Sequence, residues 1–243
     1  MVKPNFFIVG APKCGTTAMY TYLSAHPDVF MPDRKEPHFF GSDLEHLPID
    51  ARSLDEYLGL FAPAGDKKRI GEASVYYMIS HTAAQEIAAF NPAAHIIIML
   101  REPVDMLHSL YHHLLYSGSE TEATFEAALA AEPDRRAGRR LPPTMRRRQS
   151  LYYREIVAYA AQVERYFDAF GRDAVHVIHA TDGNFPADMS LSTPGGLEEE
   201  RRLMYVALTR ARDVLTLYAP LRYHHSRSRG DRHSYAPISR FLS

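Results

Sequence analysis

The chain has 243 residues, of which 23% are charged and 46% hydrophobic, the balance of an ordinary globular protein rather than a disordered or fibrous one. Lysine and arginine (28) nearly match aspartate and glutamate (29), so no overall basic charge indicates a nucleic-acid partner. The apolar runs are far shorter than the ~18 residues of a membrane span, and we expect a cytoplasmic protein without membrane contact. The single cysteine, Cys14, excludes an internal disulfide and a cysteine-cluster zinc site.

Apolar runs and helical spacings alternate along the first 180 residues. Strands are predicted at residues 6–9, 69–74, 95–100 and 174–180. Helices are predicted after Gly15 and at residues 82–90, 104–116 and 151–170, the last ended by Gly171. Strands that alternate with helices indicate a parallel sheet covered on both faces, so the expected fold class is α/β with three layers.

Seven arginines are concentrated between Arg135 and Arg148, together with two prolines and a glycine. This composition predicts a mobile loop. Two interpretations stay open: a solvated linker, or a lid whose local positive potential attracts an anionic ligand although the net charge of the chain is near zero.

The loop Gly10–Thr17 (GAPKCGTT) joins a predicted strand end to a predicted helix start. Free backbone N–H groups and the helix dipole make such a junction an anion site, and phosphate or sulfate is the expected ligand. The loop is not a Walker A loop, because that motif requires a lysine where Thr16 stands; the lysine of this loop is Lys13. The alternative is a plain strand-to-helix turn.

The segment Pro12–Pro27 (PKCGTTAMYTYLSAHP) closely resembles the 5′-phosphosulfate-binding loop of sulfotransferases that use 3′-phosphoadenosine 5′-phosphosulfate (PAPS). The resemblance implies that the lysine and the rest of the loop bind the nucleotide: Lys13, Cys14, Gly15, Thr16 and Thr17. Sulfuryl transfer builds up negative charge on the oxygen that bridges to the leaving phosphate. An ammonium and oriented amides stabilise that charge, and no metal is required.

A second segment, Arg101–Tyr111 (REPVDMLHSLY), follows a predicted strand and resembles the 3′-phosphate-binding segment of the same family. The resemblance assigns Arg101 and Ser109 to the 3′-phosphate, and a guanidinium with a hydroxyl suits a dianionic monoester. The alternatives are a surface ion pair of Arg101 with Glu102 or Asp105, and a solvent-facing Ser109.

A third segment, Lys35–Phe40 (KEPHFF), resembles the E-x-H-F-F segment of heparan-type and many bacterial sulfotransferases. Residues two apart in an extended segment point the same way, so Glu36 and His38 are expected to share one face. Glu36 is then the candidate general base, with His38 orienting or assisting it. The alternative pairs Glu36 with Lys35 or Lys3.

The segment Gly71–Ser74 (GEAS) departs from the G-E-K-[ST]-P pattern of relatives in which the lysine helps at the active site. Here Ala73 and Val75 stand in place of the lysine and the proline. The geometry of the acceptor site therefore stays open.

Beyond Arg172 the chain resembles a different family, the superfamily 1 DNA helicases of the UvrD/Rep type, whereas the sulfotransferase resemblance runs from about residue 5 to 177. The segment Glu198–Arg212 is similar to helicase motif VI, in which Arg210 corresponds to the arginine that reaches an ATP γ-phosphate. The chain upstream has no counterpart of the Walker A loop or the Mg²⁺-binding carboxylates of helicases. We therefore expect the tail to supply a strand, a helix and a strand (residues 213–219) to the sheet or beside it.

Histidines suggest a metal site only weakly. His108 and His112 are four apart on a predicted helix, and three more lie in the tail, His224, His225 and His233. Two imidazoles without a third ligand are insufficient, so surface or packing roles are expected and no metal.

Together the segments predict a three-layer, P-loop-like α/β fold that places PAPS at the C-terminal ends of the strands. Residues 1–172 are expected to form a PAPS-binding sulfotransferase domain and residues 173–243 a helicase-like fragment. The implied reaction transfers a sulfuryl group from PAPS to a hydroxyl or amine of a small-molecule or glycan acceptor. Two alternatives stay open: a fragment of an ATP-dependent DNA helicase that binds nucleotide or DNA through its tail, and an inactive fusion remnant.

Overall fold

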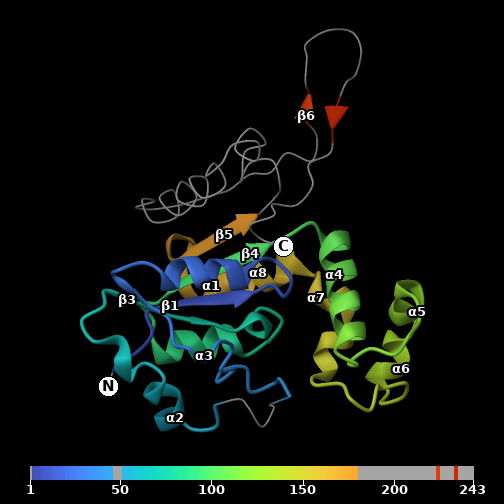
Figure 1. Ribbon diagram of the computed structural model, residues 1–243, viewed down its shortest axis with the longest axis horizontal. Helices are drawn as coiled ribbons and strands as arrows, with labels where there is room; N and C mark the ends of the chain where they lie inside the picture. Colours follow the sequence, from blue (N-terminus) through green and yellow to red (C-terminus); the bar gives the residue numbers. More distant parts are fainter. Residues whose placement is uncertain (1, 46–50, 180–222, 225–232, 235–243) are drawn as a thin grey trace.

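A computed structural model describes residues 2–45 and 51–179, and two short strands at 223–224 and 233–234 (Figure 1). In this part of the chain five parallel strands form one sheet in the order β2-β3-β1-β4-β5. The strands are β1 (Phe6–Gly10), β2 (Val29–Phe30), β3 (Arg69–Ala73), β4 (His95–Leu100) and β5 (Val175–His179). Four of them confirm predicted strands, and β2, with two residues, is too short for a sequence period to reveal.

Helices cover both faces of the sheet, as the three-layer prediction requires. They are α1 (Thr16–Ser24), α2 (Leu54–Gly59), α3 (Ala83–Phe90), α4 (Pro103–Tyr116), α5 (Phe125–Ala130), α6 (Glu132–Arg136), α7 (Tyr153–Ile156) and α8 (Tyr159–Phe170). The crossover through α1 leads to one side of β1 in the sheet, and the crossovers through α3 and α8 lead to the other side. Because such crossovers are right-handed, α1 lies on one face of the sheet and α3 and α8 on the other. There α3 and α8 contact each other. Helix α4 starts after β4 and, with α5, α6 and α7, forms a helical lobe at the end of the sheet (Figure 1).

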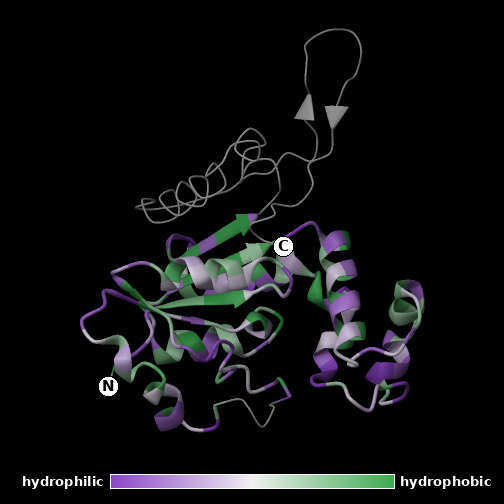
Figure 2. Ribbon diagram, viewed as in Figure 1, coloured by the Kyte–Doolittle hydropathy of each residue, from purple (hydrophilic) through white to green (hydrophobic). Residues whose placement is uncertain are grey.

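The central strands are buried on both faces. All five residues of β1 are buried, and Ile96, Ile98 and Met99 of β4 have no exposed surface. Figure 2 shows the hydrophobic residues along the strands and the hydrophilic ones concentrated on outlying helices such as α6. Such continuous apolar strands are typical of a parallel sheet between helices. Gly71 permits the close approach of β1, because a Cβ there would lie 2.1 Å from the Phe6 ring.

The single helix predicted over residues 151–170 is wrong, because the chain leaves helical geometry between α7 and α8. A 3-10 helix, Arg148–Leu151, precedes α7, and Ala158 has φ −73° and ψ 52°. The side-chain Nε2 of Gln162 donates to the carbonyls of Glu155 (2.6 Å) and Ile156 (3.3 Å). This buried amide supplies a donor to the Ile156 carbonyl and a second donor to the Glu155 carbonyl, which also accepts from the Ala158 N–H at 3.1 Å.

The arginine-rich segment is not a mobile loop throughout, because it begins inside α6 and its first arginine is buried. The side chain of Arg135 has no exposed surface, and its Nη2 lies 2.6 Å from Oε1 of Glu120, which is equally buried. Tyr153 donates to the other carboxylate oxygen at 2.8 Å. Further pairs join Arg136 to Glu155, Arg139 to Asp134, Arg140 to Glu122 and Arg148 to Glu45. Most of the segment's positive charge is therefore neutralised within the protein.

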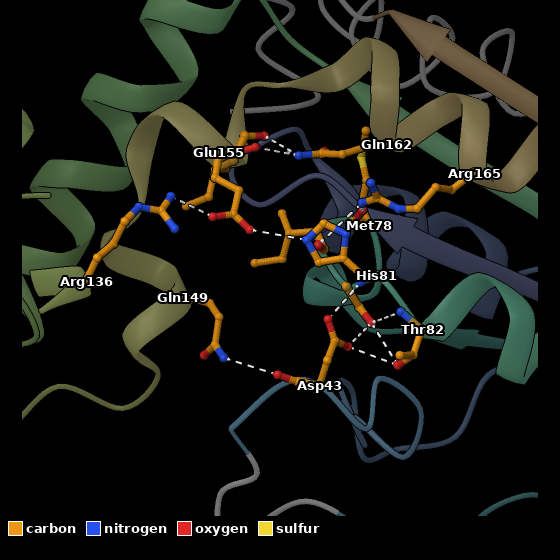
Figure 3. Close-up of polar contacts among 12 residues, drawn as sticks. Asp43, Met78, His81, Thr82, Arg136, Gln149, Glu155, Gln162 and Arg165 are labelled. Atoms are coloured by element: carbon orange, nitrogen blue, oxygen red, sulfur yellow. Dashed lines mark hydrogen bonds and ion pairs between the residues drawn. The ribbon is translucent and has the colours of Figure 1, made fainter. Parts of the chain in front are cut away.

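Polar contacts also fasten the helical lobe to the turn before α3 (Figure 3). Glu155 accepts from Arg136 at 2.8 Å, and its other oxygen lies 3.7 Å from Nε2 of His81. Asp43 accepts the His81 N–H at 2.8 Å and the Thr82 hydroxyl at 3.0 Å. The contact of His81 with Glu155 joins the lobe to this turn, and Asp43 joins the turn to the segment after Gly41.

Strand β5 confirms that the predicted strand at 174–180 joins the sheet, where it pairs in parallel with β4. Strands β6 (Tyr223–His224) and β7 (His233–Ser234) pair antiparallel. The predicted motif VI segment, its Arg210 and the strand predicted at 213–219 lie outside the described residues. In the described part of the chain no helix combines the length and the apolarity that crossing a membrane requires.

The arginine-rich segment contains a buried arginine and exposed ones, and this difference gives a direct stability test. Replacing Arg135 with alanine leaves the carboxylate of Glu120 buried without its counter-charge, and we expect a loss of about 3–5 kcal/mol in the free energy of unfolding. Arg139, with 66% of its side chain exposed beside Asp134, is the matched control, and Arg139→Ala should cost less than about 1 kcal/mol. Urea denaturation measures both; equal losses would contradict the assigned burial.

Candidate functional site

The loop between β1 and α1 has the geometry of an anion cradle. Gly10 has φ 148°, and a Cβ there would lie 2.7 Å from the carbonyl oxygen of Val75, so a side chain does not fit. Gly15 precedes α1 with φ 80°, a left-handed conformation that suits glycine. No side chain caps the helix and no acidic residue lies in its first turn. The first N–H groups of α1 are therefore available to an anion.

Two cations lie at this loop. The guanidinium of Arg101, just after β4, donates from Nη1 to the carbonyl oxygen of Lys13 at 3.4 Å, while its Nε is buried without an acceptor among the described residues. In the same part of the chain no hydrogen bond or ion pair engages the Lys13 ammonium. Glu102 instead caps α4 by accepting the Asp105 N–H at 2.9 Å, so the alternative surface ion pair of Arg101 is wrong. A buried donor without a partner fits a phosphate oxygen.

A cavity of about 480 Å³ brings most of the predicted site residues together at the carboxyl edge of the sheet. Its lining includes Lys13, Gly15, Thr16, Thr17, Glu36, Arg101 and Ser109. Ser109 is half-buried in this lining rather than solvent-facing. The volume lies within the ~300–1,000 Å³ typical of small-ligand sites, and its position matches the rule for open α/β sheets.

Two of the predicted site residues, Cys14 and His38, are not among those that line the cavity. The Cys14 thiol is buried and donates to the carbonyl of Pro12 at 3.4 Å. Burial raises the pKa of this thiol to about 12, so it stays protonated and packs inside the loop. His38 is 5% exposed and contacts the Glu36 carboxylate rather than the cavity.

Glu36 and His38 meet, but not by the predicted extended geometry. Both residues adopt left-handed backbone conformations, with φ 61° at Glu36 and 46° at His38. The turn still brings Nε2 of His38 to 3.1 Å from Oε2 of Glu36. The two side chains therefore lie together as expected, but a tight turn brings them together and not the alternation of side chains along a strand.

Glu36 is held as a carboxylate. Burial alone raises its pKa, but the hydrogen bond from His38 and the positive charge of Lys35 outweigh this and lower the pKa to about 2. Lys35 Nζ lies 2.5 Å from Oε1, so Lys35 and His38 each engage one carboxylate oxygen. The alternative pairing with Lys3 is wrong, because that ammonium lies 4.7 Å from the centre of the Phe90 ring.

The cavity also contains residues that the sequence analysis missed, Tyr76 and His113. Burial and the charges of Lys13 and Arg146 lower the pKa of His113, so its imidazole is neutral at pH 7. His113 follows Ser109 by four residues on α4, a spacing that places both on one helix face and was visible in the sequence. His108 and His112, which do not line the cavity, are exposed on α4 as His113 is, and the described residues contain no group of three metal-binding side chains.

Comparison with known proteins assigns most of the chain. The sequence profile of the sulfotransferase domain matches residues 3–173. The chain belongs to the sulfotransferase family. A crystal structure of a sulfotransferase from Alicyclobacillus acidocaldarius is 39% identical and superposes with a TM-score of 0.68, covering 79% of this chain and 78% of that one. The prediction of a sulfotransferase fold is thereby confirmed.

Curated sulfotransferases of Mus musculus match more locally. Carbohydrate sulfotransferase 15 is 31% identical over 53% of this chain and 30% of its own length. Bifunctional heparan sulfate N-deacetylase/N-sulfotransferase 1 is 30% identical over 72% of this chain and 20% of its own length. This chain therefore spans less than a third of either relative.

The C-terminal resemblance is also confirmed, since the UvrD-like helicase C-terminal domain profile matches residues 170–220. This match begins just before β5, which completes the sulfotransferase sheet. The helicase-like sequence therefore overlaps a strand of the parallel sheet.

The lowered pKa of Glu36 predicts a contribution to stability that depends on pH. An unfolded glutamate titrates near 4.5, so the contribution is complete above that pH and is lost as the pH falls towards 2. We expect the unfolding free energy of Glu36→Gln, measured from pH 6 to 2, to fall less with decreasing pH than that of the wild type. In Lys35→Ala the fall should begin at higher pH, because the pKa of Glu36 rises when the positive charge is removed. An unchanged pH dependence in both variants would contradict the assigned pairing.

Proposed function

We propose that the chain transfers a sulfuryl group from PAPS to an acceptor hydroxyl or amine. The observation that carries the proposal is the convergence of unpaired donors on one cavity: the N-terminus of α1, the Lys13 ammonium and the buried Nε of Arg101. A single carboxylate, that of Glu36, lies among the residues that line the same cavity. This combination provides sites for a strongly anionic donor and for the proton of an acceptor.

Each end of the donor has its own partners in the proposal. Lys13 with Gly15, Thr16 and Thr17 would hold the 5′-phosphosulfate, and Arg101 with Ser109 the 3′-phosphate. When bound, PAPS supplies the sulfuryl group and leaves as adenosine 3′,5′-bisphosphate. Lys13 and the amides of the loop stabilise the negative charge that grows on the leaving phosphate, so the site needs no metal ion for this purpose.

Glu36 is the candidate general base. Its low pKa makes it a weak base in the free protein. The acceptor oxygen becomes far more acidic as its bond to sulfur forms, so the carboxylate takes the proton late in the transfer. An acceptor that displaces Lys35 from Oε1 would also remove one of the charges that lower the pKa of Glu36. Acceptor binding would thereby strengthen the base.

For the acceptor we propose a glycan. The two relatives named above carry carbohydrate and heparan sulfate in their names. Lys35 lies next to Glu36, and the charge of the exposed Arg146 acts on His113 at the cavity. These cations favour an acceptor with an anionic group near the reacting hydroxyl or amine. Within the arginine-rich segment, Arg146 is the residue that fits the interpretation of a lid whose positive charge attracts an anionic ligand.

The donor site is tested by titration calorimetry with adenosine 3′,5′-bisphosphate. Lys13→Ala should abolish measurable binding, because it removes the ammonium from the cradle. Glu36→Gln should keep the affinity and lower transfer from PAPS by about 100- to 10,000-fold, the usual contribution of a general base. A large loss of bisphosphate affinity in Glu36→Gln would instead assign that residue a structural role.

The helicase alternative is tested on the same preparation with ATP and single-stranded DNA. The sulfotransferase proposal predicts no DNA-dependent ATP turnover. ATP turnover that depends on DNA, without binding of the bisphosphate, would contradict the proposal. It would favour the alternative in which the helicase-like tail binds nucleotide or DNA. Absence of both activities would favour the inactive remnant.

A further inference from the structure

Behind the Glu36 turn lies a buried carboxylate, Glu72 on β3. It has no exposed surface and forms no ion pair among the described residues. Its partners are hydroxyl groups: Ser74 donates to Oε1 at 2.5 Å and Tyr57 to Oε2 at 3.0 Å. The Tyr77 hydroxyl also favours the ionised form of Glu72, because it lowers the pKa of that carboxyl. A buried charge that is balanced by hydroxyl donors alone is expensive, so its retention calls for an explanation.

The same hydroxyl groups hold the turn that carries the candidate base. Ser74 Oγ accepts the backbone N–H of His38 at 3.1 Å. The Tyr77 hydroxyl accepts the N–H groups of Phe39 at 2.9 Å and Phe40 at 3.2 Å. Three consecutive backbone donors are therefore satisfied by two side-chain oxygens.

The direction of the hydrogen bond between Ser74 and His38 depends on Glu72. A hydroxyl has one hydrogen and two lone pairs, so it accepts from the backbone best when its hydrogen is committed elsewhere. The carboxylate of Glu72 takes the hydrogen of Ser74 and leaves the lone pairs of that hydroxyl for the N–H of His38. Linked hydrogen bonds of this kind strengthen one another in a buried setting.

The turn needs such support, because its backbone is unfavourable. The left-handed conformations at Glu36 and His38 are uncommon for residues other than glycine and persist only where the surroundings over-determine them. Besides the hydroxyl contacts, the N–H of Glu36 donates to the carbonyl of Ala73 at 2.9 Å. All of these contacts come from the end of β3 and the 3-10 helix Val75–Tyr77 that follows it.

We propose that Glu72 is a positioning residue for sulfuryl transfer, which orients Ser74 so that its hydroxyl locks the turn bearing Glu36 and His38 against the donor site. The inference rests on the proposed function, since it concerns the base of that reaction. It assigns a purpose to a buried acid that touches neither donor nor acceptor.

The electrostatics of Glu72 agree with this geometry. Burial raises its pKa to about 7, the three hydroxyl donors oppose the rise, and the negative charge of Glu36 adds to it. The donors from α2 and from the end of β3 thus favour the ionised form, which is the form that accepts the hydrogens of Tyr57 and Ser74. Variants of Glu72 are best compared at pH 8, where its carboxylate form predominates.

The test compares Glu72→Gln with Tyr57→Phe at pH 8. The amide of the first variant presents donor hydrogens to the hydroxyl groups and disrupts their orientation. The second variant removes one hydrogen bond from the same carboxylate but leaves Ser74 and Tyr77 unaffected. In Glu72→Gln we expect kcat to fall by about 10- to 100-fold with bisphosphate affinity unchanged, and amide hydrogen exchange at residues 38–40 to accelerate. Tyr57→Phe should keep kcat within about twofold.

Equal losses of kcat in the two variants, or an unchanged exchange rate at residues 38–40 in Glu72→Gln, would overturn the proposal. If Glu72→Gln does not fold, Ser74→Ala breaks the same connection to His38 and must show the same separation of kcat from affinity. If the wild-type protein transfers no sulfuryl group, the proposed function fails. The exchange measurement then still decides whether Glu72 holds the turn.

Discussion

The structure depends on a concentration of positive potential that the protein leaves without a counter-charge. The N–H groups at the start of α1, the Lys13 ammonium and the guanidinium of Arg101 converge on one cavity. By contrast, the buried Arg135 has a carboxylate partner, Glu120. Unpaired positive groups at the cavity are costly unless an anion binds there. The close packing at Gly10 and the left-handed conformation of Gly15 fix the loop that carries them.

A general base beside such a cradle presents an electrostatic conflict, because a carboxylate repels the anion that the cradle attracts. The protein moderates the conflict by engaging both oxygens of Glu36, one with Lys35 and one with His38. The same contacts lower the pKa of Glu36, and in the proposed reaction an acceptor that competes for Oε1 would relieve part of this effect. Substrate binding and base strength are thereby linked in the proposed reaction.

Contiguous segments made the site predictable in part. The anion loop, Arg101 with Ser109, and the pair Glu36 and His38 each lie within one short stretch of sequence, and the parallel sheet brings these stretches to the same edge. What the sequence did not reveal depends on contacts between distant segments. The burial of Arg135 requires Glu120, the break before α8 requires Gln162, and the turn at Glu36 requires hydroxyl groups from the end of β3. The position of His113 in the cavity lining was missed although its spacing from Ser109 was visible.

The central claim is that one nucleotide spans the cradle, with Arg101 at its 3′-phosphate. The most direct measurement compares the affinities of adenosine 3′,5′-bisphosphate and adenosine 5′-monophosphate in the wild-type protein and in Arg101→Ala. The account predicts that the wild type binds the bisphosphate much more tightly and that this preference largely disappears in the variant, because the guanidinium no longer distinguishes the two ligands. An equal preference in both proteins would contradict it.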